Sequence, residues 1–286
     1  MSCPVIAYLT RMGYDRSSMK RIITGVMAGA AWLLLLFLGP FSLFSLTITG
    51  LAGVALAEYL AIVLPGLDRR DKVPLILFGL LPLVGVFFGG PAGLLGGLTI
   101  GLIALLLYSI FRYADLDQPY EVISRGGFGY FYLSLCSAHL ILLMALPQGR
   151  AWLLLLTAIT VASDTAAFYT GRKFGIHKLH PAISPGKTWE GFAGGLLGSL
   201  IAALLVRHFF LPEQGLLWIS FIGLLLGCIG AAGDLSVSII KRAFGVKDSG
   251  NILPGHGGLL DRIDSLLLTA PLLYYLLYFG TGLCLM

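Results

Sequence analysis

The sequence predicts an all-α polytopic membrane protein with about nine transmembrane helices. Of its 286 residues, 57% are hydrophobic and only 12% are charged, whereas soluble domains carry about 25% charged residues. Apolar runs close to the roughly 20 residues needed to cross a bilayer recur along the whole chain. Lys and Arg gather in alternate connections between these runs. Together these observations exclude a soluble globular protein.

Nine apolar runs are expected to cross the membrane. Each is predicted to be helical, because a single span in lipid can satisfy its backbone hydrogen bonds only internally. Gly39-Pro40 separates the first run from the second, and Gly89-Gly90-Pro91 separates the third from the fourth. The first run is read as an uncleaved helix rather than a signal peptide. The nine runs are 22–38, 41–64, 73–88, 92–111, 128–146, 152–169, 192–211, 216–232 and 263–285.

The distribution of basic residues predicts the orientation. With the N-terminus in the cytoplasm, 17 of the 19 Lys and Arg residues fall on the cytoplasmic side, and Arg150 and Arg207 fall on the other. The C-terminus is then expected on the opposite side. Residues 1–286 are predicted to form one integral-membrane domain, with N-terminal spans in 1–150. The catalytic half, 151–286, contributes the cytoplasmic loops 170–191 and 233–262.

Cysteine spacing and net charge add little. Cys3, Cys136, Cys228 and Cys284 are widely separated, so we expect neither a disulfide nor a zinc site. The net charge of +5 follows from the basic cytoplasmic loops, and no nucleic-acid partner is expected.

Chemistry is concentrated in a polar segment near the C-terminus. Asp234, Ser238 and Lys241 stand at i, i+4 and i+7 of a predicted helix and therefore share one face. A carboxylate, a hydroxyl and an ammonium on one stripe suit a site for metal and phosphate. The charged residues and glycines that follow are Arg242, Lys247, His256, Gly257, Gly258, Asp261, Arg262 and Asp264.

These side chains predict a magnesium and phosphate site. The segment supplies carboxylate oxygens, which Mg²⁺ prefers, often together with substrate phosphates. Lys and Arg can bind further phosphate charge, and glycines let backbone amides approach an anion. A solvated loop that obeys only the positive-inside rule would explain the basic residues, but not the acids and glycines among them.

A second polar segment, 184–191, reads SPGKTWEG. Gly186-Lys187-Thr188 is like the end of a P-loop, but that motif requires glycine at position 181, where this chain has Pro181, and no strand is predicted before it. We therefore expect a basic, glycine-containing turn that enters a helix near Trp189. Lys187 is the candidate phosphate ligand of this turn.

Two acids lie inside apolar runs, where a charge is unfavourable unless it has a partner or a cavity. Asp164, beside Thr160 and Ser163, is interpreted as a site residue. For Glu58 two readings stay open: a carboxylate that snorkels or bonds to its own helix, and a functional group. Asp164 and Glu58 are both expected near the cytoplasmic ends of their spans.

The segment 238–264 resembles a known family pattern without a gap. The pattern is S-x-x-K-R, four residues, K-D-x-G, and then L-P-G-H-G-G-x-x-D-R-x-D, which is typical of phosphatidate cytidylyltransferases. The resemblance implies transfer of CMP from CTP to phosphatidic acid with Mg²⁺, giving CDP-diacylglycerol and pyrophosphate. It also implies metal ligation by Asp234 and Asp261, a place for Ser238, Lys241 and Asp264 in the same site, and a homodimer. A bacterial inner-membrane location follows, with the site facing the cytoplasm.

The chemistry suggests roles for the remaining side chains. Lys241 and Arg262 are expected to contact phosphates, and the loop that holds His256 is expected to line the leaving pyrophosphate. The sequence leaves three alternatives open: a CTP-dependent polyprenol or phytol kinase, an ion or metabolite transporter, and a lipid-binding scaffold. A transporter would show acids spread through the bilayer, whereas the acids here are expected at one face.

Overall fold

The structure is a computed structural model that describes residues 16–250, 252 and 257–280. Within these ranges, seven helices are long and apolar enough to cross a membrane, and a shorter apolar stretch covers Ile23–Leu38. The helices are α2 (Arg16–Leu38), α3 (Phe41–Val63), α4 (Arg69–Phe111), α5 (Pro119–Gly129), α6 (Cys136–Ala145), α7 (Gly149–Phe174), α8 (Trp189–Phe210), α9 (Leu216–Ala243) and α10 (Leu260–Gly280). The all-α prediction is confirmed for the described residues except for one short β-hairpin.

The element α4 contains both the third and the fourth predicted runs. Its backbone turns at Gly90, with φ 54° and ψ −136°, a conformation that side chains other than glycine rarely adopt. The two halves then pack closely. A Cβ added to Gly85 would lie 2.1 Å from the carbonyl oxygen of Gly93, and one added to Gly97 would lie 2.4 Å from that of Leu81. The break predicted at residues 89–91 is therefore present.

The fifth predicted run, 128–146, lies within a longer helical segment. It begins at Pro119, which occupies the first position of α5, where a missing N–H is tolerated. α5 continues through the π-helix η1 (Tyr130–Leu135) into α6. The sequence placed the start of this segment too late because residues 119–127 are polar.

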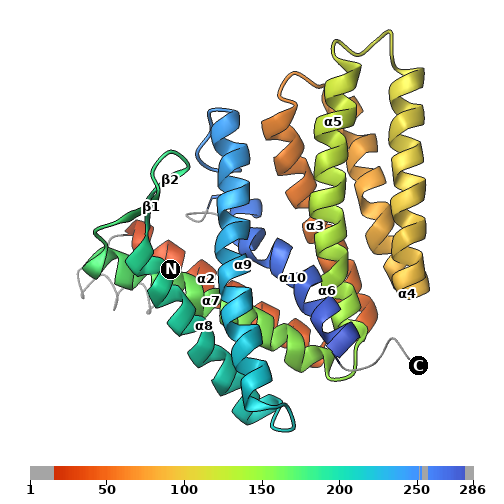
Figure 1. Cartoon of the computed structure of the whole chain (residues 1–286). Coiled ribbons are helices and arrows are strands. Elements are labelled where there is room, and N and C mark those ends of the chain that lie inside the picture. The colour runs from red at the N-terminus through yellow and green to blue at the C-terminus, as the bar shows by residue number, and fades with distance from the viewer. Residues whose placement is uncertain (1–15, 251, 253–256, 281–286) are drawn as a thin grey trace, which may run out of the picture.

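Helices α7, α8, α9 and α10 form the group that carries the polar segments (Figure 1). Small residues allow α7 and α8 to approach one another. A Cβ added to Gly198 would come 2.7 Å from the carbonyl oxygen of Ala162, and one added to Gly195 would come 3.1 Å from Ser163 Oγ. This approach sets the position of Asp164, which follows Ser163 on α7.

The segment predicted as a basic turn is instead a β-hairpin, and this corrects the expectation. Strands β1 (Lys178–His180) and β2 (Ser184–Thr188) pair antiparallel, with Lys178 opposite Thr188. At the base of the hairpin, Glu190 accepts hydrogen bonds from the amides of Ile176 and His177 at 3.1 and 3.2 Å. Thr188 caps α8 by accepting from the amide of Gly191 at 3.1 Å. Lys187 thus lies on a strand that leads directly into a helix.

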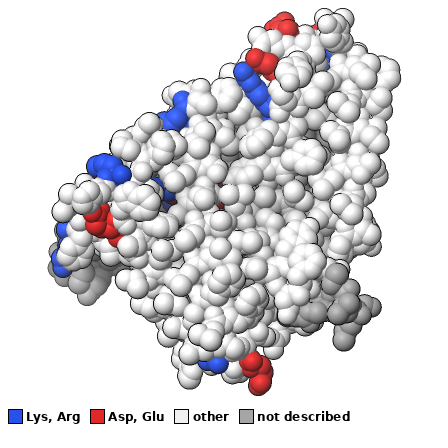
Figure 2. Space-filling view, in the orientation of Figure 1, with Lys and Arg blue, Asp and Glu red and all other residues white. Residues whose placement is uncertain are grey.

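The connections fall on two sides of the molecule. Those before and after α4, the β-hairpin and the end of α9 lie toward the top and left of Figure 1, whereas the α6–α7 and α8–α9 connections lie at the bottom. Figure 2 shows charged residues near these margins and a broad uncharged surface between them. Many large apolar side chains are exposed on the helices, as expected for surfaces that contact lipid.

Candidate active site

The predicted stripe on α9 is present. Ser238 Oγ donates a hydrogen bond to Asp234 Oδ1 at 3.3 Å, across one helical turn. Ser238 and Lys241 are buried, whereas Asp234 is half-buried. The stripe therefore runs from a buried ammonium to a carboxylate that solvent or a ligand can reach.

Two lysine–carboxylate pairs organise the site. Lys187 Nζ lies 2.6 Å from Asp234 Oδ2, and Lys241 Nζ lies 2.6 Å from Asp261 Oδ1. The side chains of the first pair are 26% and 30% exposed, and those of the second are 11% and 8% exposed. The two pairs have the same length but differ in access: the first can exchange partners with a ligand, and the second is enclosed.

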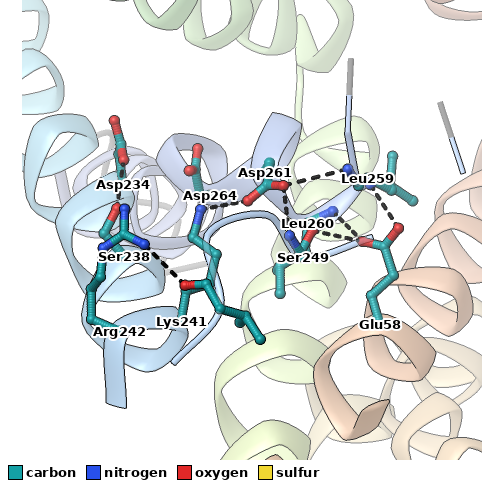
Figure 3. A network of polar contacts seen from close by, with 12 residues as sticks. Glu58, Asp234, Ser238, Lys241, Arg242, Ser249, Leu259, Leu260, Asp261 and Asp264 are labelled. Carbon is teal, nitrogen blue, oxygen red and sulfur yellow. Dashed lines mark hydrogen bonds and ion pairs between the residues drawn. The ribbon is translucent and has the colours of Figure 1, made fainter. Parts of the chain in front are cut away.

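Asp261 is held by backbone as well as by Lys241. Its Oδ2 accepts hydrogen bonds from the amide of Ser249 at 2.8 Å and from the amide of Gly258 at 3.4 Å (Figure 3). The preceding residue, Gly257, has φ 81°, which favours glycine. The anion that these loop amides approach is thus the Asp261 carboxylate.

A cavity of about 450 Å³ opens beside Asp234. It lies between α7, α8, α9 and the β-hairpin, and it has a charged part and an apolar part. Asp164, Arg172, Lys187 and Asp234 form the charged part. The apolar part includes Ala167, Phe168, Leu179, Phe192 and Ala231. Such a lining can receive a molecule with an anionic head and a nonpolar body.

Three carboxylates from three helices lie within electrostatic range of one another. Asp164 on α7 is influenced by the charges of Asp234, Lys187 and Arg262. Asp264 on α10 is influenced by those of Asp234, Asp164 and Lys241. The structure therefore brings Asp164, Asp234 and Asp264 together from three different helices.

The carboxylates of the site differ in how well they suit a magnesium ion. In the described part of the chain, no three His, Cys, Asp or Glu side chains converge in the arrangement that holds a metal. Of Asp234 and Asp261, Asp234 fits such an ion better, because its carboxylate oxygens are hard donors, it borders the cavity, and its Oδ1 has only the 3.3 Å contact with Ser238. Both oxygens of Asp261 already have close partners.

The remaining predicted residues are spread around this centre. Arg242 Nε donates to the carbonyl of Ile183 at 3.3 Å, which ties the end of α9 to the β-hairpin. Lys247 and Arg262 are exposed, and only Arg262 is near enough to Asp164 to act on it. His256 lies outside the described residues.

Sequence reasoning left Glu58 undecided and did not single out Ser249. The Glu58 carboxylate lies beside Ser249 and the start of α10, and it accepts a hydrogen bond from Ser249 Oγ at 3.1 Å (Figure 3). The signal available in the sequence was an acid inside an apolar run. Its partner could not be inferred, because the two residues are far apart along the chain.

The fold and the site define a class: a polytopic membrane protein with a charged cavity among its helices. The chain belongs to the cytidylyltransferase family, whose model matches residues 19–279. This confirms the resemblance seen in the 238–264 pattern and extends it to the N-terminal half.

Individual relatives agree with the family match. The chain is 35% identical over 268 residues to a phosphatidate cytidylyltransferase of Bacillus subtilis, covering 90% of this chain and 97% of that protein. It is 39% identical over 181 residues to a phosphatidate cytidylyltransferase of Staphylococcus saprophyticus, covering 60% of this chain and 70% of that protein. It is also 43% identical over 160 residues to the uncharacterized protein YnbB of Escherichia coli, covering 54% and 53% respectively.

Proposed function

We infer that this chain transfers CMP from CTP to phosphatidate, forming CDP-diacylglycerol and releasing pyrophosphate. The observation that carries this conclusion is the family match over residues 19–279, which includes every described residue of the charged site. The cavity beside Asp234 supports it, because charged and apolar parts adjoin there. A nucleotide from water and a lipid from the membrane require such a boundary.

The reaction requires neutralisation of negative charge and alignment of the reacting groups. The lipid phosphate is already anionic when it attacks the α-phosphorus of CTP, so no strong general base is required. The bond between the α-phosphorus and the bridging oxygen breaks, and pyrophosphate leaves with its electron pair. Catalysis then depends on neutralising crowded negative charge and on holding the reactants in line.

Lys187 is the proposed phosphate ligand in the cavity. Its ammonium pairs with Asp234 at the cavity wall, and both side chains are partly exposed. An incoming phosphate can therefore take the ammonium from Asp234 without unfolding any element. Arg172, which lines the same cavity, is placed to bind a second phosphate oxygen, and the apolar part of the lining receives the glycerol and acyl end of phosphatidate.

Magnesium belongs to this proposal as a bound cofactor. Asp234 and Asp261 are the proposed ligands. Asp234 becomes available when Lys187 moves from its carboxylate to a phosphate, whereas Asp261 would have to exchange its contacts with Lys241 and Ser249 for the ion. Bound Mg²⁺ supplies positive charge to the phosphate oxygens. Ser238 positions Asp234 through its hydrogen bond, Lys241 pairs with Asp261, and Asp264 is the neighbouring carboxylate of the same proposed site. Arg242, Lys247, Arg262 and the loop of His256, Gly257 and Gly258 remain proposed contacts of the nucleotide phosphates.

We also propose nine membrane crossings with the site at the cytoplasmic face. The turn at Gly90 divides α4 into two antiparallel helices, which supports counting two crossings there. The basic connections lie toward one side of the molecule (Figure 1), which supports a cytoplasmic N-terminus. An inner-membrane location in a bacterium and a homodimer complete the proposal.

The function is tested with purified protein in liposomes that contain phosphatidate. Added CTP should yield CDP-diacylglycerol and pyrophosphate in equal amounts. The lipid is identified by mass spectrometry, and the pyrophosphate is measured by a phosphate assay coupled to pyrophosphatase. Liposomes that carry a polyprenol or phytol instead should give no lipid product. Solute flux across the liposomes without CTP turnover would contradict the enzymatic function and would identify a transporter.

A further inference from the structure

Glu58 is a buried carboxylate from the N-terminal half that binds the catalytic segment. It lies near the end of α3 and is 5% exposed. Its Oε1 accepts from the amide of Leu259 at 2.9 Å, and its Oε2 accepts from the amide of Leu260 at 2.8 Å and from Ser249 Oγ at 3.1 Å. Figure 3 shows the carboxylate reaching from α3 toward these three groups. The reading in which Glu58 bonds to its own helix is therefore wrong.

The amides that Glu58 accepts from are those at the start of α10. The first amides of a helix have no partner within it, and they form the positive end of its dipole. A carboxylate supplied from α3 satisfies two of them and benefits from that field. The ion pairs of this region join Lys187 to Asp234 and Lys241 to Asp261, so Glu58 is stabilised by hydrogen bonds rather than by either lysine. A buried carboxylate held in this way has little freedom to move.

Ser249 connects Glu58 to the site. Its hydroxyl donates to Glu58 Oε2, and its amide donates to Asp261 Oδ2. Asp261 in turn pairs with Lys241 on α9. A continuous chain of contacts thus runs from α3 through Ser249 and Asp261 to the stripe on α9. Without the hydrogen bond between Glu58 and Ser249, the amide of Ser249 that binds Asp261 would be less firmly positioned.

The glycines of the segment make room for this carboxylate. A Cβ added to Gly250 would lie 2.7 Å from Glu58 Oε1. One added to Gly258 would lie 2.0 Å from Ser249 Oγ and 2.7 Å from Glu58 Oε2. Side chains at these positions would occupy the space that Glu58 and Ser249 now fill. Glycine at 250 and 258 is thus explained by the approach of α3.

We propose that Glu58 is a positioning residue for the transfer reaction. It fixes Ser249 and the start of α10 at Leu259 and Leu260, and thereby the Asp261 carboxylate, without touching the substrate. The catalytic part of this proposal rests on the proposed function. The anchoring part stands on the described contacts alone, and the test separates the two.

The test uses Glu58→Gln, with Glu213→Gln as the matched control. The amide –NH₂ of glutamine would face a backbone N–H, because both carboxylate oxygens of Glu58 accept from amides. Glu213 is exposed in the α8–α9 connection, away from the site. A displacement of about 1 Å in a catalytic group can lower activity on the order of 100-fold. We therefore expect kcat to fall by about 10- to 100-fold in Glu58→Gln, with KM for CTP changed less than threefold (about 0.6 kcal/mol).

Hydrogen–deuterium exchange of the full-length protein provides a readout that does not depend on activity. In Glu58→Gln the peptide covering 257–262 should exchange about tenfold faster, because the equilibrium constant for its local opening rises about tenfold. In Glu213→Gln the same peptide should exchange at the wild-type rate. Ser249→Ala removes one of the three bonds and should give a smaller rise. Ser249→Ala also provides the test if Glu58→Gln fails to insert into the membrane.

The outcomes are distinct. Wild-type exchange in both Glu58→Gln and Ser249→Ala overturns the anchor. Faster exchange with wild-type kcat overturns the positioning role. Faster exchange with no CTP turnover in the wild type leaves the anchor standing and removes the proposed function instead.

Discussion

The two lysine–carboxylate pairs give the sharpest prediction, because they have equal lengths and unequal burial. Replacing each lysine by methionine keeps the apolar stem and removes the charge. Lys187→Met leaves Asp234 at the cavity wall, where its side chain is 30% exposed and water can solvate it. Lys241→Met leaves Asp261, 8% exposed, with only the amides of Ser249 and Gly258.

The magnitudes follow from burial. A partly exposed pair contributes about 0–1 kcal/mol to stability after screening by solvent, so Lys187→Met should change the free energy of unfolding by no more than that. Breaking a buried pair costs about 3–5 kcal/mol. Asp261 keeps its two hydrogen bonds from the backbone amides of Ser249 and Gly258, so the cost of Lys241→Met should lie near the lower end of that range. For domains approaching this size, about 1 kcal/mol corresponds to roughly 2–4 °C. The expected falls in Tm are then up to about 4 °C for Lys187→Met and about 6–12 °C for Lys241→Met.

Activity should rank the variants differently. Lys187 is the proposed phosphate ligand, and removal of one preorganised electrostatic contact lowers kcat by about 10²–10³. Lys187→Met should therefore be nearly as stable as the wild type and strongly impaired. Lys178→Met is the matched control, because Lys178 is exposed on β1, and it should change neither quantity.

The assays are thermal unfolding in one detergent at one scan rate and CDP-diacylglycerol formation below the lowest Tm. Equal falls in Tm for Lys187→Met and Lys241→Met would refute the reasoning from burial. Near-normal kcat and KM in Lys187→Met would remove the phosphate role of Lys187.

Three further predictions concern the ligands and the loop. Asp234→Asn and Asp261→Asn should each abolish CTP turnover while the protein still inserts and elutes as the wild type does; near wild-type turnover in either would remove its metal assignment. Gly258→Ala should lower both Tm and activity, because the added Cβ would lie 2.0 Å from Ser249 Oγ. Gly66→Ala should lower neither, because its added Cβ meets no atom within 4 Å. Equal behaviour of the two variants would contradict the packing described for the loop. Chelation by EDTA should stop product formation, and excess Mg²⁺ should restore it; full activity in EDTA would exclude the proposed metal role of Asp234.

The spans were predictable because hydropathy is a local property. Apolar runs marked the long helices, and Gly89-Gly90-Pro91 marked the turn that the structure has at Gly90. The stripe of Asp234, Ser238 and Lys241 was predictable for the same reason, since helical spacing alone places these residues on one face. The start of α5 was not predictable in this way, because its first residues are polar and therefore do not belong to an apolar run.

The β-hairpin and the role of Glu58 depend on contacts between distant residues. β2 is short and contains Pro185, a composition that argues against a strand, and its pairing with β1 is stabilised where Glu190 bonds the amides of Ile176 and His177. Glu58 is bound by Leu259 and its neighbours through packing of α3 against the start of α10. No pattern within either segment encodes that packing.

The central claim is transfer of the nucleotidyl group of CTP to a lipid phosphate. It is tested most directly by supplying purified protein and phosphatidate with CTP labelled separately at the α- and γ-phosphates. The account predicts that the α-label enters the lipid as CDP-diacylglycerol and that the γ-label leaves as pyrophosphate. Entry of the γ-label into lipid, with the α-label retained in CDP, would contradict it and would identify a CTP-dependent lipid kinase.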